Sequence, residues 1–359
     1  MLKIINSPMK YVQGPGEIKN LASYYKTIGS SGPFFILSPS VMKNYKDELV
    51  SGFSSMDFLV EEFKRECSKN EIDRLQEKVK NSGLDAIIGV GGGKAMDTAK
   101  AVAYYLKLPV IIVPTIASTD APTSALSVLY TDDGVFDQYL VLPKNPEYVV
   151  VDSEVIAKAP SRLLVAGMGD ALATYFEARS CMSSSSKTMS GGITSLTGLS
   201  LAKLSYEVLL ENGLKAKLSC DENANSYALE AIIEANTYLS GIGFESGGLG
   251  AAHSIHNGLT VIDETHNYYH GEKVAFGTIT HLVLENAPSS EIFQVVSFCK
   301  QVGLPTKLSD IGIKNINPDK IMEVAKAACA EGETIHNMPF AVTPQLVYSA
   351  ILTADKLGR

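Results

Sequence analysis

Histidine is concentrated in one short part of this chain. Five of its six histidines lie in the stretch ESGGLGAAHSIHNGLTVIDETHNYYHGEKVAFGTITH, which ends at position 281. Imidazole is the side chain that titrates nearest to neutral pH, and it is the commonest neutral metal ligand. We therefore expect a metal site or a proton-transfer site in the second half of the chain. The five residues are His253, His256, His266, His270 and His281.

The spacing of these histidines gives partial information about a site. His253 and His256 are three residues apart and share a face of a helix, whereas His266 and His270 lie where the sequence indicates a loop. A catalytic divalent metal usually takes three protein ligands and keeps one position open. Asp170, in the apolar helical segment AGMGDALATYFEAR, is a candidate ligand because a buried carboxylate needs a partner. A helix-capping role for Asp170 and ordinary hydrogen-bonding roles for single histidines are the alternatives.

A glycine-rich segment, GVGGGKAMDTAK at 89–100, follows an apolar strand and opens a helix. Glycine allows the backbone to approach a phosphate, and a helix N-terminus offers oriented N–H donors. Gly91, Gly92 and Gly93 would form a loop that binds a phosphate, Lys94 adds a positive charge, and Asp97 falls on the first turn of the helix. The pattern is neither G-x-G-x-x-G nor the P-loop, so a tight turn without a ligand is the alternative.

A second polar segment, PTIASTDAPTSALSV at 114–128, follows the next strand. Its hydroxyl groups could bind a ribose or a pyrophosphate at the carboxyl end of a sheet. Taken alone, the segment favours a loop whose polar side chains hydrogen-bond to its own backbone. Its polar side chains are Thr115, Ser118, Thr119, Asp120, Thr123 and Ser124.

The elements that must position these residues fall into two groups. In the first 150 residues, apolar strand segments alternate with helical ones, which predicts an α/β domain with a parallel sheet covered on both faces. Asp133-Gly134 predicts the turn of a hairpin inserted in that pattern. The expected strands are 34–38, 57–63, 85–90, 109–114 and 147–152, and the expected helices are 69–82 and 95–107.

From residue 161 onward, almost every segment has the period of a helix. The expected helices are 161–181, 198–212, 223–241, 272–286, 289–301, 319–330 and 344–357. At 359 residues the chain is longer than one compact core usually supports. We therefore predict an α/β dinucleotide-binding domain over 1–160 and an all-helical metal- and substrate-binding domain over 161–359.

Composition excludes several classes of function. Apolar residues make up 45% and charged residues 19%, a globular composition, and the net charge of -8 disfavours nucleic acid and anionic membranes as partners. No signal-peptide pattern and no apolar run long enough for a membrane span are visible. We expect a cytoplasmic protein that acts on a small molecule.

Longer stretches of the sequence resemble the glycerol dehydrogenases of the iron-containing, or group III, alcohol dehydrogenase superfamily. The resemblance begins near residue 10 and continues to the C-terminus. It implies a Rossmann-like nucleotide-binding domain followed by an all-α domain, the dehydroquinate synthase-like architecture. The matching stretches are GGGKAMDTAK, PTIASTDAPTSALSVLYTD, LPKNPEYVVVDSEVIAKAPSRLLVAGMGDALATYFEAR, EANTYLSGIGFESGGLGAAHSIHNGLT, HGEKVAFGT and AACAEGETIHNMP.

The resemblance implies roles for single residues. The metal ligands of the family fall on Asp170, His253 and His270, with zinc expected and Fe²⁺ or Mn²⁺ as alternatives. Asp120 matches a substrate-contacting carboxylate, and Phe244 lies where the family lines its substrate pocket. His256 matches a histidine near the reacting centre that does not itself bind the metal; it is expected to relay a proton, with a structural hydrogen-bonding role as the alternative. The NAD contacts fall on Gly91, Gly92, Gly93, Lys94, Asp97, Thr115, Ser118, Ser124, Leu126 and Tyr130.

One position departs from the pattern of the family. Many relatives carry an aspartate after an early strand of the first domain, placed to bind the ribose of adenosine. Here the segment is FILSPSVMK, with Pro39 in that place. Loss of a carboxylate removes repulsion against the 2′-phosphate of NADP. NAD remains the expected cofactor, and its discrimination from NADP is left open.

The resemblance implies NAD-dependent oxidation of glycerol and related vicinal diols to dihydroxyacetone, by hydride transfer from an alkoxide at the metal. It also implies a homo-oligomer, expected to be an octamer. Another polyol dehydrogenase of the superfamily is the nearest alternative. A metal-dependent hydrolase would not need the glycine loop. A dehydroquinate synthase-like lyase would need basic residues for an acidic substrate, and Lys273 is the only one between 244 and 281.

Overall fold

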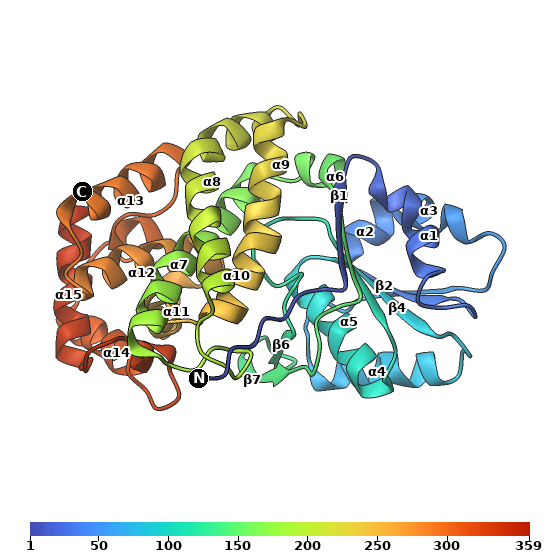
Figure 1. Cartoon of the computed structure of the whole chain (residues 1–359), viewed down its shortest axis with the longest axis horizontal. Coiled ribbons are helices and arrows are strands. Elements are labelled where there is room, and N and C mark those ends of the chain that lie inside the picture. The colour runs from blue at the N-terminus through green and yellow to red at the C-terminus, as the bar shows by residue number, and fades with distance from the viewer.

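The structure is a computed structural model that describes residues 1–359. All strands lie in the first part of the chain, and the second part is helical (Figure 1). The strands are β1 (Lys10–Gly14), β2 (Pro33–Leu37), β3 (Leu59–Glu62), β4 (Ala86–Gly91), β5 (Val110–Pro114), β6 (Leu126–Tyr130), β7 (Phe136–Val141) and β8 (Tyr148–Asp152).

Six strands form a parallel sheet in the order β1-β8-β5-β4-β2-β3. Its central strands are buried along their whole length because both faces of the sheet are covered. Phe34 and Ile36 of β2 belong to the core on one face, while Phe35 and Leu37 belong to the core on the other. This alternation is the two-residue period of a strand.

Helices cover the two faces of this sheet. One face packs against α1 (Leu21–Tyr25), α2 (Pro39–Asn44) and α3 (Lys46–Val50), and the other against α4 (Lys69–Lys80) and α5 (Gly93–Leu106). The remaining two strands, β6 and β7, form an antiparallel hairpin outside the sheet. In Figure 1 this hairpin lies between the sheet and the helices that follow it.

The second part of the chain is a bundle in which α7 packs against α8, α10 and α12. No helix is both long enough and apolar enough to cross a membrane. The helices are α6 (Ser153–Ala157), α7 (Ser161–Ser184), α8 (Leu196–Asp221), α9 (Tyr227–Glu234), α10 (Ser240–Gly247), α11 (Ala251–Leu259), α12 (His270–Leu284), α13 (Ser289–Val302), α14 (Pro318–Ala328) and α15 (Pro344–Leu357).

The predicted class, an α/β part followed by helices, is confirmed, with four local differences. Strand β1 was not predicted; KYVQG alternates weakly and pairs only with β8 at the edge of the sheet. The short helices α1, α2 and α3 were also not predicted. The helix expected over 223–241 is divided, because a π-helical turn at Ala235–Leu239 separates α9 from α10. Helix α8 is longer than expected and reaches Asp221.

Candidate metal centre and cofactor cleft

The three predicted metal ligands meet in the helical part of the chain. Asp170 comes from α7, His253 from α11, and His270 is the first residue of α12. Their candidate ligand atoms all lie within 4.8 Å of one another. The Nε2 atoms of His253 and His270 lie 3.3 Å and 3.1 Å from Oδ1 of Asp170. One carboxylate and two imidazoles thus converge on one point, which is the donor set of a catalytic divalent metal.

Close contact between the backbones of two helices brings Asp170 and His270 together. A Cβ atom added at Gly271 would lie 1.8 Å from the carbonyl oxygen of Ala166, and one added at Gly169 would lie 2.3 Å from that of Gly271. Only glycine permits this approach of α12 to α7. The two glycines flank the ligands directly in sequence, so they determine the distance between them.

The hydrogen bonds of both histidines direct Nε2 toward Asp170. His253 Nδ1 lies 2.6 Å from Oε2 of Glu177, and His270 Nδ1 lies 3.1 Å from Nε2 of His256. An imidazole that donates its Nδ1 proton keeps the lone pair of Nε2 free for a metal. The residues present therefore fit a divalent ion. Glu177 and His256 contribute to that fit because they orient the two histidine rings.

The charges at this site favour a cation. Burial would raise the pKa of Asp170, but His270 and His253 hold it well below its ordinary value. Burial would lower the pKa of His253, but Glu177 and Asp170 raise it well above its ordinary value. These buried carboxylates thus stabilise a positive charge at the position of the His253 ring. A metal ion bound by Asp170 and neutral histidines would supply that charge.

The other histidines have separate roles. His256 contacts His270 and also lies 3.0 Å from Oδ1 of Asn257 through its Nδ1 atom. Burial and the neighbouring His270 lower the pKa of His256 well below its ordinary value, so its ring is neutral. His266 is exposed and bonds to the carbonyl of Thr260, and His281 is buried beside Ser180. The predicted cluster therefore contributes three histidines to the site.

The loop between β5 and β6 reaches this site from the α/β part. The backbone N–H of Asp120 donates to Oδ2 of Asp170 over 3.3 Å, and the hydroxyl of Ser240 donates to Oδ2 of Asp120 over 3.0 Å. Burial and the charge of Asp170 raise the pKa of Asp120 well above its ordinary value. A carboxyl group in this position can hydrogen-bond a hydroxyl of a small polar molecule.

The glycine loop lies where β4 ends and α5 begins. Gly92 is the N-cap of α5 and offers no side-chain cap, so the first N–H groups of the helix have no side-chain acceptor there. A Cβ atom at Gly93 would meet no atom within 4 Å, so the loop borders open space. Backbone donors facing open space at a helix N-terminus fit the pyrophosphate of a dinucleotide.

Lys94 and Asp97 are both engaged within the protein. The ammonium of Lys94 bonds to Glu66 at 2.6 Å and lies 4.6 Å from the ring centre of Tyr130. Asp97 accepts a hydrogen bond from the backbone of Val128 and pairs with the buried Lys100 at 2.9 Å. Direct contact of either side chain with a phosphate stays a prediction. Both anchor the loops around the glycine turn.

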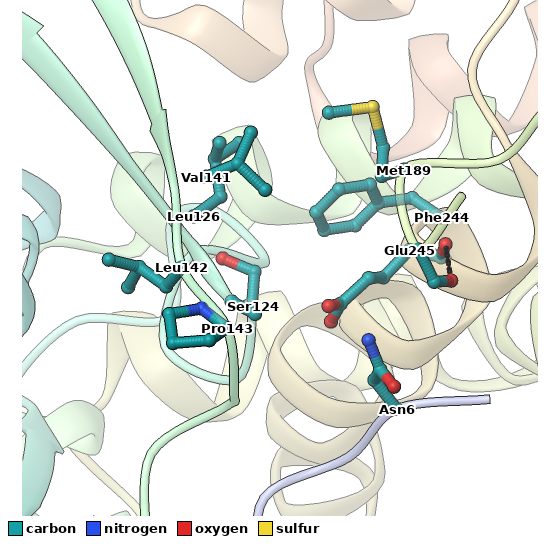
Figure 2. Close-up of a pocket in the computed structure, with 11 residues that line it drawn as sticks. Asn6, Ser124, Leu126, Val141, Leu142, Pro143, Met189, Phe244 and Glu245 are labelled. Carbon is teal, nitrogen blue, oxygen red and sulfur yellow. Dashed lines mark hydrogen bonds between the residues drawn. The ribbon is translucent and has the colours of Figure 1, made fainter. Parts of the chain in front are cut away.

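A cavity of about 240 Å³ lies at the boundary of the two parts of the chain; Figure 2 shows the residues that line it. Ser124, Leu126 and Val141 line one side of it, and Phe244 and Met189 line the other. The cavity thus brings predicted cofactor contacts beside the predicted substrate-pocket residue. Thr115 and Ser118 follow β5 and are half-buried.

Comparison with known proteins agrees with this geometry. The model of the family "iron-containing alcohol dehydrogenase" matches residues 8–153. A glycerol dehydrogenase of Citrobacter freundii is 55% identical over 100% of this chain and 99% of its own length. One from Thermotoga maritima is 52% identical over 98% and 96% of the two chains. This chain belongs to the iron-containing alcohol dehydrogenase family.

Two solved structures have the same fold as this chain. The crystal structure of a probable glycerol dehydrogenase from Sinorhizobium meliloti superposes with a TM-score of 0.94 at 44% identity and covers 99% of both chains. A sulfoacetaldehyde reductase from Bifidobacterium kashiwanohense, solved with NAD⁺, has a TM-score of 0.81 at 18% identity, over 99% of both chains. The second likeness concerns the fold alone. Within this family the chain uses a dinucleotide and a divalent metal.

The structure of this dehydrogenase also shows site residues that sequence reasoning missed. Glu177 holds His253, and Glu245 lines the cavity, where it accepts a hydrogen bond from Asn145 at 2.7 Å. Lys100 is buried and donates to the carbonyl of Ala121, in the loop that carries Asp120, and to that of Leu126 at the start of β6. Charged residues within otherwise apolar helices were the available signal, because burial of a charge requires a partner.

Proposed function

We propose that this enzyme oxidises glycerol and related vicinal diols to dihydroxyacetone and the corresponding ketones, with reduction of NAD. The observation that carries the proposal is the contact between the Asp120 loop and Asp170, at 3.3 Å. It supports a site in which a diol lies between the ligands of the helical part and the cofactor loops of the α/β part. The glycerol dehydrogenases of Citrobacter freundii and Thermotoga maritima support the substrate class.

Asp170, His253 and His270 would hold the divalent ion, and we propose zinc, with Fe²⁺ or Mn²⁺ as alternatives. An ion held there supplies Lewis acidity, which lowers the pKa of an alcohol hydroxyl. Asp120, itself held by Ser240 at 3.0 Å, would orient a neighbouring hydroxyl of the diol. Two adjacent hydroxyls can then be fixed at once, which favours diols over simple alcohols.

His256 and Phe244 would complete the substrate site. His256 accepts the Nδ1 proton of His270 at 3.1 Å and so holds the orientation of that ring. The alternative is that His256 carries the hydroxyl proton away from the substrate. Its Nδ1 atom, which contacts Oδ1 of Asn257, would then pass the proton on toward solvent. Phe244 is buried at the cavity wall, where its ring would keep water from the reacting carbon.

NAD supplies the acceptor for the hydride that leaves the secondary carbon. Gly91, Gly92 and Gly93 would bind its pyrophosphate through backbone N–H groups, with Lys94 and Asp97 supporting the loop. We propose that the remaining contacts come from the two segments beside this loop. These residues are Thr115, Ser118, Ser124, Leu126 and Tyr130.

The same proposal gives the two parts of the chain different binding roles. Residues 1–160 would bind the dinucleotide, and residues 161–359 would bind the metal and the diol. We further propose a cytoplasmic homo-oligomer, an octamer by analogy with its family, whose size sedimentation would measure.

The substrate proposal is tested by following NADH absorbance with glycerol, 1,2-propanediol and ethanol as substrates. We expect both diols to be oxidised with kcat/KM at least about 100-fold above ethanol, since a second hydroxyl contact contributes about 3 kcal/mol in a buried site. Equal kcat/KM for ethanol and glycerol would contradict the assignment of two hydroxyl contacts. Absence of NADH formation with every diol would remove the proposed activity altogether.

A further inference from the structure

Glu177 is a buried carboxylate that is neither a candidate metal ligand nor part of a cofactor loop. It lies on α7, seven residues after Asp170, so the two carboxylates lie on nearly the same face of the helix. Its side chain is 0% exposed, and no lysine or arginine pairs with it. A buried carboxylate is costly unless hydrogen bonds compensate it.

All of the hydrogen bonds of Glu177 go to one segment, the beginning of α11. Its Oε1 atom accepts from the backbone N–H of Gly250 at 2.9 Å and from that of His253 at 3.0 Å. Its Oε2 atom accepts from Nδ1 of His253 at 2.6 Å. The N-cap of α11 is Gly250, which has no side chain to cap the helix, so Glu177 supplies this cap from another helix.

These contacts determine which nitrogen of His253 faces the metal site. An ionised carboxylate only accepts hydrogen bonds, so the proton of the neutral ring lies on Nδ1. The lone pair of Nε2 then points toward Asp170, whose Oδ1 atom lies 3.3 Å away. The two contacts of Oε1 fix the backbone of the same residue, so the ring has little freedom to turn.

We propose that Glu177 is the positioning residue of the metal site: it fixes the tautomer and the orientation of His253. This inference rests on the proposed metal ligands. Helix α7 then provides one ligand, Asp170, and also the group that orients a ligand on α11. Because Asp170 and Glu177 lie on the same helix, the position of Asp170 and the orientation of His253 depend on each other.

The test is the zinc affinity of Glu177→Gln, measured by competition with a chromophoric chelator. The amide keeps the size of the side chain, but its NH₂ group faces N–H donors that need an acceptor. We expect the dissociation constant for zinc to rise about 10- to 100-fold, as for other groups that hold metal-bound histidines. The absorption spectrum of the Co²⁺-loaded variant should also differ from that of the wild type, and excess zinc should restore much of kcat.

Glu285→Gln is the matched control. Glu285 is also a mostly buried carboxylate beside a histidine, with Oε2 lying 3.6 Å from Nε2 of His281, but it does not contact the ligands. The zinc affinity of Glu285→Gln should equal that of the wild type. Glu177→Asp keeps the charge but is one methylene shorter; it should bind zinc with intermediate affinity, and it serves if the glutamine variant does not fold.

The outcomes separate this inference from the function proposed above. Unchanged zinc affinity in both Glu177 variants would overturn the positioning role while leaving the proposed activity intact. Equal weakening in Glu177→Gln and Glu285→Gln would also overturn it, because any buried carboxylate would then act alike. A wild-type chain that binds neither zinc nor Co²⁺ would overturn the metal-dependent function itself, and the inference with it.

Discussion

At the scale of single residues, glycines at a helix contact bring two candidate ligands together. Asp170 and His270 are these two, and each lies one residue from a glycine at that contact. The histidine cluster predicted a metal site, and the resemblance selected the three ligands that the structure brings together. Glu177 and Glu245 were not predicted, because a glutamate in a helical segment usually faces solvent. Their roles become visible only through contacts with residues distant in sequence, His253 for Glu177 and Asn145 for Glu245.

Pro39 makes a prediction at this scale about the cofactor. It is the first residue of α2, two residues after the end of β2, and it is half-buried. Pro39→Asp would place a carboxylate where the ribose of adenosine binds in dinucleotide folds, and it would repel a 2′-phosphate. We expect the ratio of kcat/KM for NAD to that for NADP to rise about tenfold or more, which is ~1.4 kcal/mol.

The control for this cofactor prediction is Asn44→Asp, at the exposed end of the same helix. It adds the same charge farther from the strand end and should leave the ratio within about twofold of the wild type. Dissociation constants from nucleotide fluorescence would show whether the change arises in binding. An unchanged ratio in Pro39→Asp would place the adenosine ribose elsewhere.

At the scale of elements, sequence pattern and structure agree where the pattern is strong. The strands β2, β4, β5 and β8 were predicted because buried parallel strands are continuous apolar runs. The hairpin was predicted from Asp133-Gly134, and the turn between β6 and β7 contains it. Edge strand β1 and the π-helical turn at Ala235–Leu239 were missed, because neither leaves a distinct periodicity.

The two kinds of glycine in this chain predict opposite effects of alanine. At Gly93 an added methyl group meets open space, so Gly93→Ala should fold normally, while the dissociation constant for NAD rises about tenfold because the methyl group enters the phosphate cradle. At Gly271 the methyl group would strike α7, so Gly271→Ala should lose ~1–3 kcal/mol of stability.

Thermal unfolding and titration with NAD would separate the two glycine effects. Gly93→Ala should keep the melting temperature of the wild type, and Gly271→Ala should lower it together with the bound metal. Normal NAD affinity in Gly93→Ala would mean that the glycine loop is only a turn. That outcome would favour the alternative left open by the sequence.

At the scale of the whole molecule, hydrogen bonds connect the sheet to the helices beside the site. Tyr11 of β1 bonds to Thr237 at 2.8 Å, and Asn145, which precedes β8, bonds to Glu245 at 2.7 Å. Asp120 adds a contact with Asp170 itself. Glu245 lines the cavity of Figure 2, whereas Asp120 contacts a candidate metal ligand, so both features lie where the two parts of the chain meet. No periodicity in the sequence could predict this meeting.

The most direct test of the central claim compares the wild type with His270→Ala in glycerol oxidation, before chelation, after chelation and after return of zinc. We expect the wild type to lose activity on chelation and to regain it with zinc. The variant should bind less than one zinc per chain and show kcat/KM at least about 1000-fold lower throughout, since a Lewis acid contributes several kcal/mol. Full zinc content and full activity in His270→Ala would contradict the account.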